Sequence, residues 1–302
     1  MKNNMMKETV LITGHHGNLA KETKDILQKN YNVRSLTTNK DISNQKSIFY
    51  WNVEEKYIDI EALEDCNHII HLAGLSILKR WSYKNKKLMY ESRIGGSKLL
   101  FEKCKELHIH PNTFITSSAI GFYGLNNKTI KKEDDAPGND WVSKMAYDWE
   151  EAANEFKKIG SRVVKMRISL LFDKKSGFLK YNLLSMRFGI GGMIGNAQKK
   201  INWIHINDAA RFIDESIRTK KYCGAYNLAN KEDITQKEIF KAIKKKLFPY
   251  SLIIRVPKII IKLILGKRSL IITNDIVVSS EKLKEVGFKW KYERFEDVLD
   301  SN

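Results

Sequence analysis

The sequence predicts an α/β fold in which a doubly wound parallel sheet is followed by a smaller C-terminal lobe. Through the first half of the chain, short apolar β-rich runs alternate with segments of helical spacing. A turn with two glycines joins the first run to the first helix. After about residue 170 this alternation stops. Because parallel strands need right-handed crossovers, the alternation implies one sheet with helices on both faces.

The elements expected in the first half follow one another in alternation. Runs rich in Val and Ile indicate strands, and apolar residues spaced by three and four indicate helices. Strands are expected at residues 10–13, 33–36, 68–72, 113–117 and 163–168, with helices at 19–29, 84–107 and 143–157.

The second half begins with a glycine-rich segment at residues 188–198. A short strand then precedes a helix whose first turn Asp208 is placed to cap. Ser280 is placed to cap a later helix that Gly287 ends. No internal repeat or low-complexity tract interrupts this half.

The chain is strongly basic, with 53 Lys and Arg against 35 Asp and Glu, which gives a net charge of +18. A charge of this sign helps binding to phosphate-rich partners. The lysines are scattered, and blocks such as 244–246 are rare. General use of lysine explains this pattern better than a nucleic-acid groove, so we expect no specific nucleic-acid partner.

Cysteine use and hydropathy indicate the compartment. Cys66, Cys104 and Cys223 lie far apart without C-x-x-C spacing, which fits a reduced compartment and predicts neither a disulfide nor a metal site. Residues 1–14 contain no apolar signal core. The apolar stretch 257–267 is interrupted by a lysine and is too short to span a bilayer. We expect a cytoplasmic protein with no membrane partner, present as a monomer or homodimer.

The first turn carries the spacing G-x-x-G-x-x-A, at Gly14, Gly17 and Ala20. Glycines let the backbone turn sharply and let a pyrophosphate approach, and the helix that follows offers free N–H groups. The motif predicts a Rossmann-type dinucleotide site. His15 and His16 need supply only backbone here; solvent-facing imidazoles are favoured over a hydrogen bond to phosphate.

The end of the second expected strand bears on the choice of cofactor. NAD sites usually place an acid about 20 residues after the glycine turn, where it holds the ribose hydroxyls. Thr37 and Thr38 stand at this point, and Asp41 comes a little late. Arg34 and Lys40 are near in sequence. The pattern favours NADP and leaves NAD possible.

The ordered motifs resemble the extended short-chain dehydrogenase/reductase superfamily. Within it, the chain is similar to bacterial and organellar "epimerase family" proteins with a small C-terminal domain of unknown function. The resemblance runs from about Thr9 to Val298. It is carried by ITGHHGNLA (12–20), HLAG (71–74), KRWSYKNKKLMYESRIGGSKLL (79–100), SSAIGFYG (117–124), FGIGGMIGNAQKKINWIHINDAARFI (188–213), VPKIIIKLILG (256–266) and LKEVGFKWKY (283–292).

The resemblance implies a division of the chain and a set of cofactor-binding residues. Residues 1–170 would form mainly the NAD(P)-binding domain, and residues 171–302 the substrate side, with the family-specific part at about 250–298. The cofactor-binding residues implied are Gly14, His15, His16, Gly17, Asn18, Leu19, Thr38, Leu72, Ala73, Gly74 and Ser117.

The catalytic Tyr-x-x-x-Lys pair typical of the superfamily is missing. Its positions are occupied by Val142 and Ala146. Members with the pair use the tyrosine to exchange a proton while hydride moves to or from nicotinamide. Ser118 matches the family serine and would hold a substrate oxygen. We predict Tyr123 as the side-chain acid, with a packed loop aromatic as the alternative.

Several residues are expected on the substrate side. Trp81 and Trp203 could line a pocket or belong to the core, and His205 is more often a structural hydrogen-bonding residue in such surroundings. The predicted substrate-side residues are Arg80, Trp81, Gln198, Trp203 and His205.

The leading functional hypothesis is an NADP-binding oxidoreductase or epimerase-like enzyme acting on a small substrate, such as a nucleotide-sugar or carbonyl compound. The missing pair motivates an alternative, a cofactor-binding regulatory or scaffold protein with little catalysis.

Overall fold

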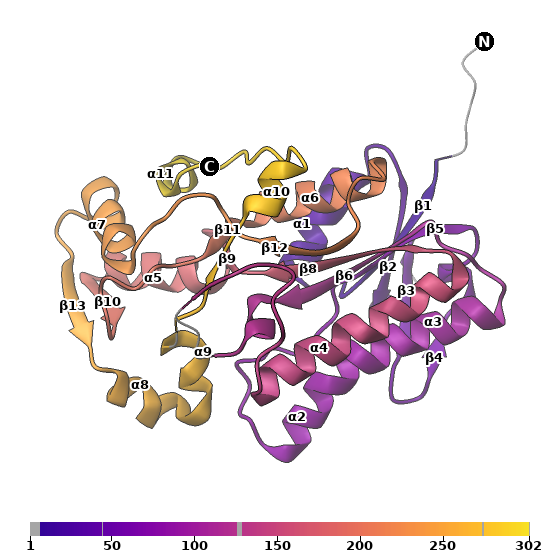
Figure 1. Cartoon of the computed structure of the whole chain (residues 1–302), viewed down its shortest axis with the longest axis horizontal. Helices are drawn as coiled ribbons and strands as arrows, with labels where there is room; N and C mark the ends of the chain where they lie inside the picture. Colours follow the sequence, from indigo (N-terminus) through magenta and orange to yellow (C-terminus); the bar gives the residue numbers. More distant parts are fainter. Residues whose placement is uncertain (1–6, 44, 126–128, 274, 302) are drawn as a thin grey trace, which may run out of the picture.

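The computed structural model describes residues 7–43, 45–125, 129–273 and 275–301, and its centre is an eight-stranded sheet (Figure 1). The strands are parallel apart from β4, which runs antiparallel to β3. The spatial order is β12 (Gly224–Leu228), β8 (Arg162–Ile168), β6 (Thr113–Ala119), β5 (Cys66–His71), β1 (Thr9–Thr13), β2 (Asn32–Thr37), β3 (Ile48–Asn52) and β4 (Tyr57–Ile58).

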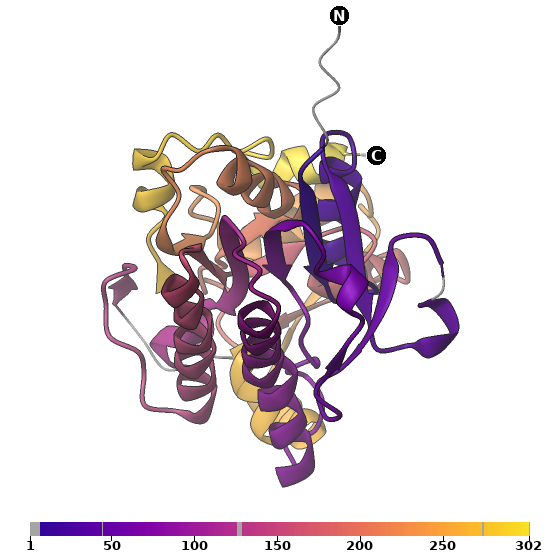
Figure 2. The same cartoon turned by 90° about the vertical axis from the view of Figure 1, so that its right-hand side faces the viewer.

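Helices cover both faces of this sheet, as Figures 1 and 2 show. One face carries α1 (Asn18–Leu27) and α6 (Ile206–Arg218), whose apolar side chains share a buried cluster with β1 and β8. The other face carries α3 (Gly96–Glu106) and α4 (Trp141–Asn154). The doubly wound fold predicted from the sequence is confirmed.

The five strands expected in the first half are present, but three further strands of the sheet, β3, β4 and β12, were not expected. β3 is rich in strand-forming Ile and aromatic residues, a signal that was overlooked, whereas β12 begins with a glycine, which weakens its strand pattern. The helix expected at residues 84–107 is divided into α2 (Tyr83–Tyr90), a π-helical turn at Glu91–Gly95, and α3. Such π turns occur frequently at functional sites.

The later part of the chain forms a lobe beside the sheet, at the left of Figure 1. Its core contains Phe172, Trp203 and Phe295. The chain also returns to the main sheet, because β12 pairs with β8 and α6 packs on α1. The lobe elements are β9 (Leu170–Phe172), α5 (Gly177–Arg187), β10 (Ile190–Ile194), β11 (Trp203–His205), α7 (Gln236–Lys246), β13 (Leu252–Val256), α8 (Lys258–Leu265), α9 (Ser269–Thr273) and α11 (Phe295–Asp300).

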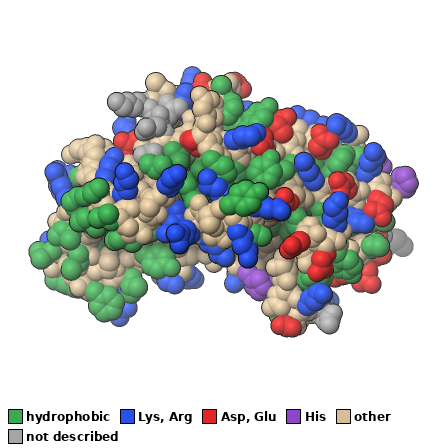
Figure 3. Space-filling model, turned by 90° about the horizontal axis from the view of Figure 1, so that it is seen from below, with side chains coloured by type: hydrophobic (Ala, Val, Ile, Leu, Met, Phe, Trp, Pro, Cys, Tyr) green, Lys and Arg blue, Asp and Glu red, His purple; other side chains and the backbone are tan. Residues whose placement is uncertain are grey.

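Helix α8 buries none of its residues, although it is strongly apolar. Leu263 and Ile264 are 79% and 68% exposed. Figure 3, which views the molecule from below, shows hydrophobic side chains gathered on the side of the lobe and acidic ones mostly on the opposite side. Within the described residues, no helix has the length and hydropathy needed to cross a membrane.

The structure corrects both helix caps expected in the second half. His205, not Asp208, precedes α6, and its Nδ1 accepts a hydrogen bond from the Asn207 amide. Asp208 instead accepts from the amides of Lys291 and Tyr292, which ties the C-terminal segment to α6. Helix α10 (Glu281–Glu285) begins after Ser280 without a side-chain cap.

Candidate functional site

The site lies at the carboxyl ends of β1 and β5, where the chain order of the sheet changes direction. In open α/β sheets, ligands bind at such a switch point. Gly14 follows β1 with φ of +81°, and a Cβ there would lie 3.1 Å from the backbone N and Cα of Ala73. Only glycine meets both demands. Gly14, Leu72 and Ala73, all predicted for the cofactor site, are therefore adjacent at this edge.

The N-terminus of α1 offers unpaired backbone donors at the same edge. Gly17 precedes the helix, and no side chain caps it. A Cβ on Gly17 would lie 3.1 Å from the Gly14 carbonyl oxygen, so the turn is tight. Asn18 is exposed, whereas the side chain of Leu19 belongs to the core. The free N–H groups and the positive end of the helix dipole can bind a pyrophosphate.

The two histidines of the turn occupy different surroundings. His15 is half-buried and His16 is exposed, with their rings 5.0 Å apart and nearly perpendicular. Burial lowers the pKa of His15, and the neighbouring His16 lowers it further. His15 is therefore uncharged at neutral pH, and its part in holding a phosphate stays a prediction.

A buried chain of hydrogen bonds positions the loop after β5. The Thr13 hydroxyl accepts from the amides of Leu72 and Ala73, at 3.1 and 3.0 Å, and contacts His71 Nδ1 at 2.9 Å. His71 Nε2 lies 3.0 Å from the Arg93 carbonyl oxygen. Burial lowers the pKa of His71 to about 4, so the ring is neutral, with Nε2 donating to Arg93 and Nδ1 accepting from Thr13.

Arg93 closes the other side of this loop. Its Nη1 donates to the carbonyls of Leu75 and Met89 at 2.9 and 3.1 Å. A Cβ on Gly74 would lie 3.0 Å from the Arg93 guanidinium carbon, so this exposed glycine permits the approach. The π-helical turn that contains Arg93 thus supports the edge predicted to bind the cofactor. This supporting role was not predicted from the sequence.

The end of β2 is open to solvent, as an adenosine ribose site requires. Thr38 and Lys40 are exposed, and the Lys40 ammonium lies 4.9 Å from the centre of the Tyr50 ring. Arg34 was offered as a second positive charge here, and the structure corrects this. Its Nη1 donates to the carbonyls of Glu61 and Glu64, at the amino end of β5 and so at the opposite edge of the sheet.

Strand β3 brings a further segment to this edge. Asn52 and Val53 stand at its carboxyl end, and Val53 Cγ1 would lie 3.0 Å from a Cβ on Gly95. Neither residue was predicted for this edge, because strand β3 was not expected.

A buried ion network joins β6, β8 and α4. Ser118 Oγ donates to Glu150 Oε1 at 2.8 Å. Arg167 Nε and Nη2 donate to the two oxygens of the same carboxylate at 2.8 and 3.0 Å. Lys165 Nζ lies 3.5 Å from Glu150 Oε2. Ser118, Glu150 and Arg167 are 3%, 2% and 4% exposed, and Ser117, the residue before Ser118 in β6, is 8% exposed.

Tyr123 belongs to this network and is 2% exposed. Its hydroxyl donates to Asn227 Oδ1 at 2.7 Å and accepts from Arg167 Nη1 at 2.8 Å. Burial raises the pKa of Tyr123 to about 12. A structural role fits this placement better than proton transfer, and the acid role predicted for Tyr123 stays a prediction.

The positions of the missing pair are apolar in space as well as in sequence. Val142 and Ala146 are both buried on α4, and Val142 Cγ1 would lie 3.0 Å from a Cβ on Gly121. Neither side chain can exchange a proton.

The five substrate-side residues do not gather in one place. Trp203 is fully buried and stacks on Phe172 with ring centres 5.0 Å apart, so it is a core residue. His205 is buried and stacks on Tyr292 at 3.6 Å, and burial lowers its pKa to about 4. Gln198 is exposed.

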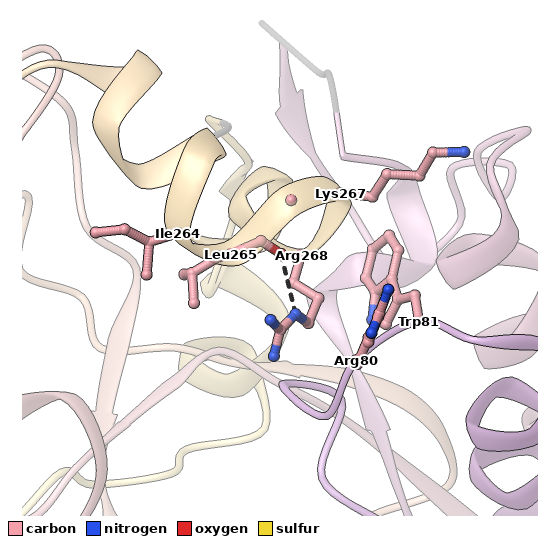
Figure 4. A pocket seen from close by; sticks show the side chains of 7 residues that line it. Arg80, Trp81, Ile264, Leu265, Lys267 and Arg268 are labelled. Carbon is pink, nitrogen blue, oxygen red and sulfur yellow. Dashed lines mark hydrogen bonds between the residues drawn. The ribbon is translucent and has the colours of Figure 1, made fainter.

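Arg80 and Trp81 do line a pocket, together with a segment of the C-terminal lobe. Its volume is about 420 Å³. Arg268 crosses it by donating from Nη1 to the Leu78 carbonyl at 2.8 Å. Figure 4 shows Arg80 and Trp81 on one side and the lobe segment on the other. The residues that line this basic pocket are Arg80, Trp81, Ile264, Leu265, Gly266, Lys267 and Arg268.

Comparison with known proteins extends over nearly the whole chain. Residues 10–229 match the NAD dependent epimerase/dehydratase family, and residues 256–301 match a domain of unknown function, DUF1731. An epimerase family protein of Staphylococcus epidermidis is 30% identical over 96% of this chain and 97% of its own length. One from Staphylococcus aureus is 28% identical over the same shares.

Solved structures share the fold. A human epimerase family protein (isoform2) with NADPH superposes with a TM-score of 0.83, at 20% identity, over 96% of this chain and 97% of its own. A UDP-glucuronic acid 4-epimerase from Bacillus cereus, in complex with UDP-glucuronic acid and NAD, gives 0.77 at 17% identity, over 97% and 96%.

Proposed function

The chain belongs to the NAD-dependent epimerase/dehydratase family, and from this premise we propose that it is an NADP-binding oxidoreductase or epimerase-like enzyme acting on a small substrate. The observation that carries the proposal is the edge formed by β1, the uncapped N-terminus of α1 and the loop after β5. Free amides meet tightly packed glycines there, as a bound pyrophosphate requires.

The preference for NADP is supported by the end of β2. Thr38 supplies no carboxylate to hold a ribose diol, and the exposed Lys40 supplies a positive charge for a 2′-phosphate. The human relative was solved with NADPH, and the Bacillus cereus epimerase with NAD. We therefore infer a preference for NADP in this chain.

The reaction would be hydride transfer between the nicotinamide and a carbon of the substrate that bears oxygen. Val142 and Ala146 offer no proton, so another group must supply it. Tyr123 is the side-chain acid predicted for this work, and Ser118 is predicted to hold the substrate oxygen; both hydroxyls are committed to the buried network in this structure. Bound water is the remaining source that does not require the network to open.

The absence of the Tyr-Lys pair favours a second candidate, a cofactor-binding protein with little catalysis. Turnover separates the two. The protein would be mixed with NADPH and a panel of carbonyl compounds and nucleotide-sugars, and the absorbance of reduced nicotinamide followed. Epimerisation, which leaves that absorbance unchanged overall, would be followed by chromatography of the sugars. Tight NADPH binding with no turnover on either readout would favour the second candidate.

A further inference from the structure

The basic pocket carries positive charge without a matching negative charge. Three of its seven lining residues are cationic, and none is acidic. Arg80 and Lys267 are exposed, and neither has a carboxylate partner among the residues that the structure describes. Cations gathered around one cavity attract an anionic group, most strongly when it is partly desolvated.

The remaining walls of the pocket are apolar. Trp81 lies on one side, and Ile264 and Leu265, from the end of α8, lie on the other. Ile264 is 68% exposed, so the helix presents uncovered apolar surface at this point. A ligand with an apolar or planar part would cover this surface and gain the free energy of its burial.

Hydrogen bonds hold the walls in place. Trp81 Nε1 donates to the Ile77 carbonyl at 2.9 Å, and the Trp81 ring packs against Trp141 at 5.1 Å between centres. Arg268 Nε donates to the Leu265 carbonyl at 3.0 Å, the bond drawn in Figure 4. A pocket whose walls are already fixed loses little conformational entropy when it binds.

The loop that forms one wall begins at the proposed cofactor edge. It leaves Ala73 and Gly74, is held at Leu75 by Arg93, and reaches the pocket at Trp81. Trp141, which Trp81 contacts, directly precedes Val142. The pocket is therefore a short distance along the chain from both the proposed cofactor edge and the position of the missing tyrosine.

We propose that the basic pocket binds the anionic group of the substrate, a phosphate or a carboxylate, while Trp81 and the end of α8 contact its apolar or planar part. This inference rests on the proposed function, because calling the bound molecule a substrate places the pocket beside a cofactor-dependent reaction. The presence of an anion-binding site is testable independently of that function.

The test follows the Trp81 indole N–H signal in nitrogen-15 correlated spectra. The chain has six tryptophans, and the signal that disappears in Trp81→Phe identifies Trp81. Phenyl phosphate and benzoate probe the two anionic groups with a ring, and benzyl alcohol probes the ring alone. The variant Arg80→Gln/Lys267→Gln removes two pocket charges, and Lys79→Gln/Lys262→Gln removes two exposed charges that do not line the pocket.

We expect phenyl phosphate, benzoate or both to shift the Trp81 signal, with benzyl alcohol much weaker. Affinity should fall about tenfold or more in the pocket variant and stay unchanged in the control variant. Added salt should weaken the response of the wild type, which tests the charge without a mutation. An unmoved Trp81 signal, or equal shifts by benzyl alcohol, would overturn the proposal.

Calorimetry with NADPH separates this result from the proposed function. Normal NADPH binding with no shift of the Trp81 signal would refute the anion-binding pocket while still supporting the proposed cofactor site. A Trp81 response without NADPH binding keeps the anion-binding site and removes the proposed function.

Discussion

The Ser118 hydroxyl donates a 2.8 Å hydrogen bond to Glu150 Oε1, so this serine is directed towards helix α4. Arg167 pairs with the same carboxylate, and both charges are almost completely buried. A buried ion pair therefore holds the serine to which the family resemblance assigns a substrate oxygen.

Removing the Glu150 charge should strongly destabilise the fold. Glu150→Gln leaves the buried Arg167 without a counter-charge, and breaking such a pair typically costs about 3–5 kcal/mol. Urea denaturation measures the loss. The matched control is Glu155→Gln, which removes an exposed partner of Lys158 and should cost about 1 kcal/mol or less. Equal losses in the two variants would contradict the importance of the buried network.

Tyr123→Phe distinguishes a structural from a catalytic hydroxyl. Because Asn227 and Arg167 each lose a partner, we expect the free energy of unfolding to fall by about 1–3 kcal/mol, with NADPH affinity unchanged. From the burial of Tyr123, turnover on an identified substrate should change little. A loss of about 10²–10⁴-fold in turnover would instead establish Tyr123 as the acid predicted from the sequence.

Gly17→Val should abolish NADPH binding. The added side chain would meet the Gly14 carbonyl oxygen and occupy the space that a pyrophosphate needs above the α1 N-terminus. Calorimetry measures the binding, and circular dichroism checks the fold. Gly160→Val is the control, because it places the same side chain at a strained position away from the site. Unchanged affinity in folded Gly17→Val would remove the cofactor assignment.

Thr38→Asp should reverse the cofactor preference. A carboxylate at the end of β2 would repel a 2′-phosphate and hold a ribose diol, so NADP affinity should fall about tenfold or more relative to NAD. Competitive titration gives the ratio. Arg34→Gln serves as the control, since Arg34 supports the opposite edge and its loss should leave the ratio unchanged. Wild-type protein that binds NAD as well as NADP would refute the preference itself.

Stability should decrease on acidification between about pH 6.5 and pH 4. Burial lowers the pKa of His71 and of His205 to about 4, whereas both titrate near 6.5 when unfolded. The unfolded chain therefore binds protons first as the pH falls, which costs up to about 3 kcal/mol for each histidine. Urea denaturation across this range measures the slope. His205→Asn keeps a capping acceptor for α6 without a titrating group, and should make the slope shallower.

Local chain chemistry determined much of the fold in advance. Apolar periodicity or glycine spacing indicated five strands, the glycine turn and the helices of the first half. The glycine spacing indicated Gly14, and the family resemblance added Ala73 and Gly74; the three lie at one edge because the carboxyl ends of parallel strands meet there. Arg80 and Trp81, predicted for the substrate side, both line the basic pocket, and their contact with substrate stays a prediction.

The environment of each polar side chain was decided only by the tertiary structure. Trp203 and Gln198 are five residues apart in the sequence, yet Trp203 belongs to the core and Gln198 is exposed. Arg34 lies near Lys40 in sequence but serves the opposite edge of the sheet. Spacing along a chain fixes which face a residue takes; it does not fix which distant group meets it there.

The sequence by itself determined the doubly wound sheet, the dinucleotide turn and the absence of the Tyr-Lys pair, because each depends on residues close together along the chain. The Ser118–Glu150–Arg167 network and the hydrogen bond from Arg268 to the Leu78 carbonyl across the basic pocket depend on segments that fold onto one another from far apart. Only the packed structure decides such contacts, since burial and partner geometry belong to the whole molecule.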